Sequence, residues 1–328
     1  MKVAVALAAY AALLATGGAW LLRRARWPER APRLGIVAWQ ALSVSALASV
    51  VMAGAALTVP TVRVSADLAD LLQACVMALR AQYSTRGGAA AGATGAALAL
   101  VVLARAAYCV AGTIVQAVCG RARQREVLTL VGRADAGRDV VVVGHHRPAV
   151  YCLPGRHRRI VVTSGALDVL DDAQLAAVLA HERAHLAERH DLVLACAMGL
   201  ARAFPRVRLF RVAEAETTRL VELLADDVAC RRADRLTLAE ALLDLAGSPA
   251  RAAAMSAGGT TAALRVRRLM SPHQPIGPAR AGLGSLTAAA VVTLPLLVFA
   301  GPAIAATQVD YCPPAGATMA MTDADTGP

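Results

Sequence analysis

The sequence has few charged and few aromatic residues for its length. Of its 328 residues, 17% are charged and 3% are aromatic, whereas 57% are hydrophobic. Soluble domains usually carry about 25% charged residues, so a wholly soluble protein is disfavoured. The apolar excess consists mainly of alanine, leucine and valine, which is typical of membrane helices.

Two further patterns are missing. None of the seven cysteines forms a C-x-x-C pair, which argues against zinc-ribbon and thioredoxin-like sites. The net charge of +11 is compatible with a nucleic-acid binder, but the arginines are scattered and lack interleaved aromatic residues. A nucleic-acid interface needs a concentrated basic face, so we expect no direct nucleic-acid partner.

Long uncharged runs are present instead. Three of them, at about 3–22, 35–60 and 281–305, contain no charged residue. A fourth run, 88–118, is interrupted only by Arg105. About 20 apolar residues cross a bilayer, so we expect four transmembrane helices. Arg105 is expected at the interface, where a long side chain can reach water.

The first run is an anchor rather than a cleaved signal peptide in this interpretation. A signal peptide carries its positive charge before the apolar run. Here five arginines follow it directly: Arg23, Arg24, Arg26, Arg30 and Arg33.

Arginine placement predicts the topology. Of the 33 arginines, 24 lie between 121 and 280, and positive loops remain cytoplasmic. We therefore expect residues 120–280 inside and the tail, 306–328, outside. Cys75 and Cys312 would both lie outside, where they either pair or remain small apolar side chains.

Residues 120–280 are long enough for a single domain, and their pattern predicts an α+β fold. Asp171 and Gln174 form a capping-box pattern at the start of a helix, whose apolar face would comprise Leu175, Val178, Leu179, Leu186 and Leu192. Strands are expected at 139–144, 149–154 and 158–165, and helices at 121–132, 210–232, 236–246 and 262–270.

A metal-site motif lies on the helix after the strands. His181, Glu182 and His185 spell H-E-x-x-H. Residues i and i+4 share one helix face, so the two imidazoles can converge on one cation. Glu182 projects beside that cation and can accept a proton from water. The alternative is a charged helix surface without a metal.

A second helix supplies the missing carboxylates. Glu222 and Asp226 lie at i and i+4 in "LVELLADDVA". Two histidines and one glutamate form a known catalytic zinc set with an open fourth position. Asp226 can accept the remaining N–H of a ligand histidine. On its own this segment also fits a solvated helix face.

H-E-x-x-H followed by E-x-x-x-D resembles the gluzincin metallopeptidases. The run 152–191 is similar to the BlaR/MecR membrane antirepressor peptidases and to the HtpX-type membrane proteases. The resemblance covers about 120–280. It implies a zincin-like cytoplasmic domain inserted between the third and fourth of four spans, which is the layout that the arginines predict.

The resemblance also implies residue roles. His181, His185 and Glu222 would bind one Zn²⁺ per chain, Glu182 would be the general base, and Asp226 would orient a ligand. Arg265 is a candidate oxyanion or substrate contact, with contact to the membrane surface as the alternative. The strand at about 148–153 would hold an extended substrate by backbone pairing along an exposed edge.

The sequence departs from these families in two ways. About 23 residues follow the last span, without a Ser-x-x-Lys motif, so penicillin sensing is not supported. Related proteases often carry an acid five residues after the second histidine, where this chain has His190 followed by Asp191. Neither is given a role, and four further histidines are expected in loops or interfaces: His145, His146, His157 and His273.

The sequence thus predicts an N-terminal membrane domain (1–119), a cytoplasmic zinc metallopeptidase domain (120–280), a fourth span (281–305) and a short tail. The predicted function is hydrolysis of a cytosolic or membrane-proximal protein, with Glu182 assisting the attack of zinc-activated water. A BlaI-like winged-helix repressor is the substrate suggested by resemblance, and the lipid bilayer is the other expected partner. The alternative is a membrane signalling or scaffold protein with a catalytically silent zinc fold.

Overall fold

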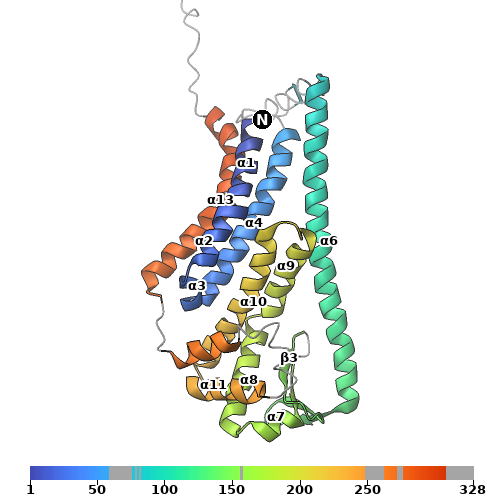
Figure 1. Cartoon of the computed structure of the whole chain (residues 1–328). Coiled ribbons are helices and arrows are strands. Elements are labelled where there is room, and N and C mark those ends of the chain that lie inside the picture. The colour runs from blue at the N-terminus through green and yellow to red at the C-terminus, as the bar shows by residue number, and fades with distance from the viewer. Residues whose placement is uncertain are drawn as a thin grey trace, which may run out of the picture.

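Helices dominate the computed structural model, and one small sheet lies at the end of the molecule remote from the N-terminus (Figure 1). The structure describes residues 1–58, 76–77, 80, 83–155, 158–247, 262–271 and 276–307. The predicted α+β class is confirmed. Cys75 and Cys312, for which pairing was left open, lie outside the described residues, as do the tail after 307, His157 and His273.

Four helical stretches in the described residues are long and apolar enough to cross a membrane. The first, Lys2–Arg24, consists of α1 (Lys2–Leu13), the π-helical turn η1 (Leu14–Gly18) and α2 (Ala19–Arg24). The short α3 (Trp27–Arg30) leads into the second, α4 (Pro32–Thr58). The other two lie in α6 (Arg86–Val131) and α13 (Pro278–Thr307). Each contains one of the four long apolar runs of the sequence.

Small and polar residues join these helices. Tyr10 on α1 and Ser45 on α4 both donate hydrogen bonds to the carbonyl of Val291 on α13, at 3.1 Å and 2.6 Å. Gly54 and Gly95 bring α4 and α6 so close that a Cβ on Gly54 would lie 2.5 Å from the Gly95 oxygen. Close approach at small residues is characteristic of helix packing in membranes.

Helix α6 continues without a break across the expected end of the third span. It has 46 residues, which corresponds to about 69 Å, so the predicted span 88–118 and the predicted helix 121–132 form one helix. Arg105 donates a hydrogen bond from Nε to the carbonyl of Ala203 at 2.6 Å. Ala203 ends helix α9 (His190–Ala203), where a cation is favoured by the helix dipole.

The sheet has four strands in the order β1-β2-β4-β3. Strands β2 and β4 are parallel, and the outer strands pair with them in antiparallel fashion. Strand β3 is therefore an edge strand. The strand bounds are β1 Gly132–Asp135, β2 Val140–Val143, β3 Val150–Leu153 and β4 Arg159–Thr163. Three of these strands were predicted, whereas β1 was not.

The helices after the sheet begin with α7 (Ser164–Val169) and α8 (Asp172–Ala187). The predicted capping box is present: Asp171 accepts from the Gln174 amide and Gln174 from the Asp171 amide. The prediction that Leu192 belongs to this apolar face was wrong, because α8 ends at Ala187. The remaining helices are α9, α10 (Arg208–Ala229), α11 (Arg235–Ala246) and a helix at 262–270.

Helices α9 and α10 form a hairpin that packs against the membrane-span candidates (Figure 1). One apolar cluster joins residues of the spans, such as Leu14 and Trp39, to residues of the hairpin, such as Phe210 and Leu220. A second cluster joins the sheet to α8 and α11. This packing holds α10, together with its acidic residues, against the membrane-span candidates.

Candidate metal centre

Helix α8 carries the H-E-x-x-H motif on the side that faces α10. The capping box starts the helix, and Leu175 and Val178 anchor it in the core with the sheet. His181 is buried at 6% exposure, while Glu182 and His185 are half-buried. One face of α8 therefore presents both imidazoles away from water.

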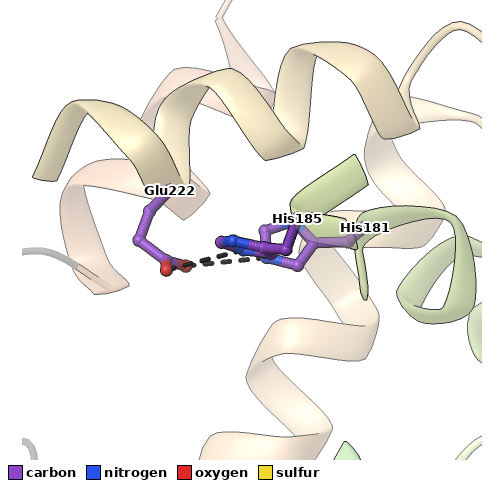
Figure 2. A group of neighbouring side chains, drawn as sticks. All are labelled: His181, His185 and Glu222. Atoms are coloured by element: carbon purple, nitrogen blue, oxygen red, sulfur yellow. Dashed lines mark hydrogen bonds and ion pairs between the residues drawn. The ribbon is translucent and has the colours of Figure 1, made fainter. Parts of the chain in front are cut away.

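Helix α10 brings Glu222 to the two histidines (Figure 2). Glu222 Oε2 lies 3.6 Å from Nε2 of His181, and Glu222 Oε1 lies 3.7 Å from Nε2 of His185. The two Nε2 atoms are 3.1 Å apart. The three groups each offer one ligand atom within 4.8 Å of the others. The structure thus brings together the three residues that the sequence predicted as ligands.

Asp226 lies behind His181, one turn further along α10. Its Oδ1 is 3.0 Å from Nδ1 of His181, which leaves the Nε2 edge of that ring for Glu222 and His185. Asp226 is 1% exposed. A carboxylate on the second ring nitrogen fixes the tautomer and orientation of a ligand histidine, and this is the position predicted for Asp226.

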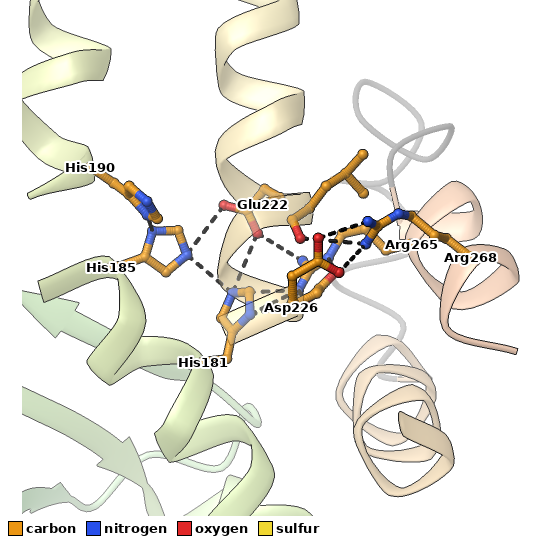
Figure 3. A network of polar contacts seen from close by, with 9 residues as sticks. His181, His185, His190, Glu222, Asp226, Arg265 and Arg268 are labelled. Atoms are coloured by element: carbon orange, nitrogen blue, oxygen red, sulfur yellow. Dashed lines mark hydrogen bonds and ion pairs between the residues drawn. The ribbon is translucent and has the colours of Figure 1, made fainter. Parts of the chain in front are cut away.

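Arg265, on the helix at 262–270, places a positive charge beside the carboxylates of Glu222 and Asp226 (Figure 3). Its Nη1 lies 2.8 Å from Glu222 Oε2, and its Nη2 lies 2.7 Å from Asp226 Oδ1. Arg268 and Asp227 form a further ion pair, at 2.7 Å, between the same two helices. Two arginines, through three ion pairs, thus hold the 262–270 helix against α10.

These contacts separate the pKa values of the two histidines. Burial alone would lower the pKa of His181, but its bonds to Asp226 and Glu222 outweigh burial and raise the pKa to about 9. For His185, burial and the neighbouring His181 charge lower the pKa to about 4. Burial would raise the pKa of both carboxyls, yet His181 and Arg265 bring those of Glu222 and Asp226 to about 2.

His190 is a member of this cluster that the sequence analysis did not identify. Its Nδ1 lies 3.1 Å from Nδ1 of His185, and the residue is 2% exposed (Figure 3). Arg189, at φ 51°, adopts the left-handed conformation that turns the chain from α8 into α9. Sequence spacing placed His190 five residues after His185 but could not show that the turn folds it back.

A cavity of about 960 Å³ opens beside the cluster. All three predicted ligands line it, together with Glu182 and Arg265. Its other walls come mainly from the edge strand β3, from α11 and from the 262–270 helix. Burial raises the pKa of Glu182, which lies next to Cys152 of β3. A proton-accepting group, a cation and an open strand edge therefore share one cavity.

The donor set fits a zinc ion. Ligand bonds of about 2.0–2.1 Å at a tetrahedral centre put two ligand atoms about 3.3 Å apart, and the observed separations of 3.1, 3.6 and 3.7 Å lie around this value. The fourth side is the cavity. Elsewhere, His145 and His146 stack on each other at 4.9 Å in the loop between β2 and β3, outside this group.

Sequence comparison bears on this site. Residues 118–207 match the model of Peptidase family M48. The match covers about a quarter of the chain, including the sheet and all of α8, and it ends before α10. No curated protein and no solved structure matches the chain.

The M48 match supports a metallopeptidase, and the M48 family depends on zinc. It is consistent with both the BlaR-type and the HtpX-type membrane metallopeptidases, and it does not single out the BlaR/MecR subtype. The residues from α10 and the 262–270 helix lie beyond the match, so their assignment rests on the geometry.

Proposed function

We propose that the protein is a membrane-anchored, zinc-dependent endopeptidase. The observation that carries this proposal is the convergence of His181, His185 and Glu222 on the wall of a large cavity. The M48 match over the preceding sheet and α8 supports it. Two histidines and a glutamate with an open fourth side constitute a catalytic rather than a structural zinc set.

In this proposal, His181, His185 and Glu222 hold the ion, and Asp226 orients His181. A bound zinc ion supplies Lewis acidity to the scissile carbonyl and to water. Glu182 accepts a proton from the attacking water and delivers it to the leaving amine. Its raised pKa suits this role, because a general base works best when its pKa approaches the working pH. Arg265 lines the cavity as a candidate donor to the developing oxyanion.

The edge strand β3 is the proposed binding site for the substrate backbone. Among the described strands, β3 pairs with β4 alone, and Tyr151 and Cys152 line the cavity. An extended peptide can add to such an edge by backbone hydrogen bonds. The substrate is therefore an unfolded or locally extended segment of a cytosolic or membrane-proximal protein, and a winged-helix repressor is one candidate by family resemblance.

The proposed location is the membrane, with the metal centre on the cytoplasmic side. Within the described ranges, four apolar helical stretches have sufficient length to span it. Arginine is concentrated between 121 and 280, and arginine-rich segments remain in the cytoplasm. A reporter fused after residue 328 should then be detected outside; a cytoplasmic signal would reverse the orientation.

A cleavage assay with Glu182→Gln tests the enzymatic proposal. The full chain in lipid nanodiscs is incubated with a peptide library, and new termini are identified by mass spectrometry. Glu182→Gln should keep zinc and lose about 10²–10⁴-fold in rate, the usual contribution of a general base. The matched control is Glu240→Gln, at an exposed position on α11, which should cleave like the wild type.

The same assay distinguishes the proposed peptidase from the alternative function. A catalytically silent zinc fold would bind zinc but cleave no library peptide and no cytosolic protein. Comparing the proteomes of wild-type and Glu182→Gln cells extends the test to natural substrates. Uncleaved proteins should accumulate only in the variant, and identical proteomes would favour the scaffold role.

A further inference from the structure

A basic groove lies between the first membrane-span candidate and the start of α10, far from the metal centre. Its volume is about 410 Å³, and its walls include Trp20, Arg23 and Arg24 on one side and Arg208 on the other. A shallower hollow next to it is lined by Arg23, Arg208 and Arg211. We refer to Trp20, Arg23, Arg24, Arg208 and Arg211 together as the arginine groove.

In the part of the chain that the structure describes, the charges of the arginine groove have no carboxylate partner. Among the described residues, no ion pair involves Arg23, Arg208 or Arg211. Glu216, at the margin of the hollow, is paired with Arg219 at 2.8 Å. At the metal centre, by contrast, every arginine meets a carboxylate.

The helix geometry adds to this imbalance. Arg208 is the first residue of α10, and Arg211 lies in its first turn. The N-terminal end of a helix carries partial positive charge, so two cations there are unfavourable unless an anion is bound nearby. An anion in the groove would therefore be attracted both by the guanidinium groups and by the helix end.

The surroundings indicate what kind of anion fits. The groove lies where the span candidate Lys2–Arg24 ends, and apolar side chains on that span are exposed next to it, with Leu21 at 66% and Trp20 at 57%. Arg24 lies over the Trp20 ring at 4.4 Å. Tryptophan is enriched at the level of lipid headgroups. Phosphate-binding groups thus adjoin a surface suited to acyl chains.

We propose that the arginine groove binds the headgroup of an anionic phospholipid from the leaflet on the metal-centre side. Guanidinium groups of Arg23 and Arg208 donate paired hydrogen bonds to the phosphate oxygens. The acyl chains lie along the exposed apolar face of the first span. The inference depends on the proposed membrane location but not on peptidase activity.

Lipid titration of the purified full chain tests this proposal. Phosphatidylglycerol with brominated acyl chains is added to the detergent-solubilised protein, and quenching of tryptophan fluorescence reports binding. The double variant Arg23→Gln/Arg208→Gln should bind about 30-fold more weakly, the combined effect of two arginines near a lipid surface. Phosphatidylcholine with the same acyl chains should bind to the wild type as weakly as phosphatidylglycerol binds to the double variant.

The matched control removes two arginines just beyond the C-terminal end of α10. Arg231→Gln/Arg232→Gln makes the same charge change at exposed positions and should bind phosphatidylglycerol like the wild type. Equal loss in both double variants would mean general surface attraction and would overturn the site. Inorganic phosphate that displaces the lipid at equal concentration would overturn the choice of a lipid ligand.

Two measurements keep the test independent of folding and of the peptidase. Arg208→Gln alone changes one exposed residue, and it should still weaken binding about five-fold. The titration repeated with Glu182→Gln should match the wild type, because the base takes no part in lipid binding. Unchanged affinity in Arg208→Gln would contradict the proposal even if the enzyme cleaves peptides.

Discussion

The proposed metal centre has two halves that are built differently. On one side, His181 is held by the carboxylate of Asp226, which is itself paired with Arg265. On the other side, His185 is held by the imidazole of His190. The first half is ionic and depends on three separate helices. The second is formed by neighbouring segments, α8 and the start of α9.

This difference shows how one motif places its two histidines in unlike environments. Hydrogen bonds to carboxylates raise the pKa of His181, whereas burial lowers that of His185. A carboxylate on the ring makes a histidine a stronger ligand and fixes its orientation. A neutral imidazole fixes the orientation without adding charge. We therefore expect substitutions in the ionic half to have larger effects than substitutions in the neutral half.

The largest expected effect comes from the ligands themselves. His181→Ala and His185→Ala should each weaken zinc binding by more than about 100-fold, beyond the range of outer-sphere changes. Zinc competition with a fluorescent chelator measures this. Equal losses would show that both halves supply a ligand, and retention of wild-type affinity in either variant would remove that histidine from the site.

The second prediction concerns the ionic half. Asp226→Asn should weaken zinc binding about 10–100-fold and lower the free energy of unfolding by roughly 3–5 kcal/mol, because a buried ion pair loses one partner. Asp227→Asn is the matched control, since Asp227 pairs with Arg268 and does not touch a ligand. It should cost about 1 kcal/mol and leave zinc affinity unchanged.

If both variants lost stability to the same degree and neither lost zinc affinity, Asp226 would be an ordinary ion-pair residue. Chemical unfolding and zinc competition on the same samples separate the two outcomes.

The smallest effect is expected in the neutral half. His190→Phe keeps a buried ring but removes the acceptor for His185, so zinc binding should weaken about 10-fold, at the lower end of the range for outer-sphere residues. His146→Phe, at an exposed position, is the matched control. Zinc competition measures the affinity of both variants. If His190→Phe bound zinc as tightly as the control, His190 would only fill space.

The sequence predicts the local features of this site well. Helical spacing alone puts His181 and His185 on one face, and the Asp171–Gln174 capping box marks where α8 begins. The strands around 140, 150 and 160 follow from short apolar runs between turn residues. These features depend on neighbours in the chain, which is why periodicity and capping chemistry reveal them.

The other features of the site and of its setting could not be predicted from the residues alone. Arg265 meets Asp226 across 39 positions of sequence, and no spacing rule relates them; only family resemblance suggested Arg265. The return of His190 depends on the left-handed conformation of Arg189. Strand β1, "GRAD", has no apolar alternation and forms because β2 offers it an edge. The packing of α9 and α10 against the spans likewise depends on tertiary contacts.

X-ray absorption at the zinc edge of the loaded, purified full chain tests the central claim most directly. We predict one zinc per chain with nitrogen and oxygen ligands at about 2.0–2.2 Å, including two imidazoles, and loss of this signal in His181→Ala. Sulfur ligands at about 2.3 Å, or an unchanged spectrum in that variant, would contradict a zinc centre at His181, His185 and Glu222.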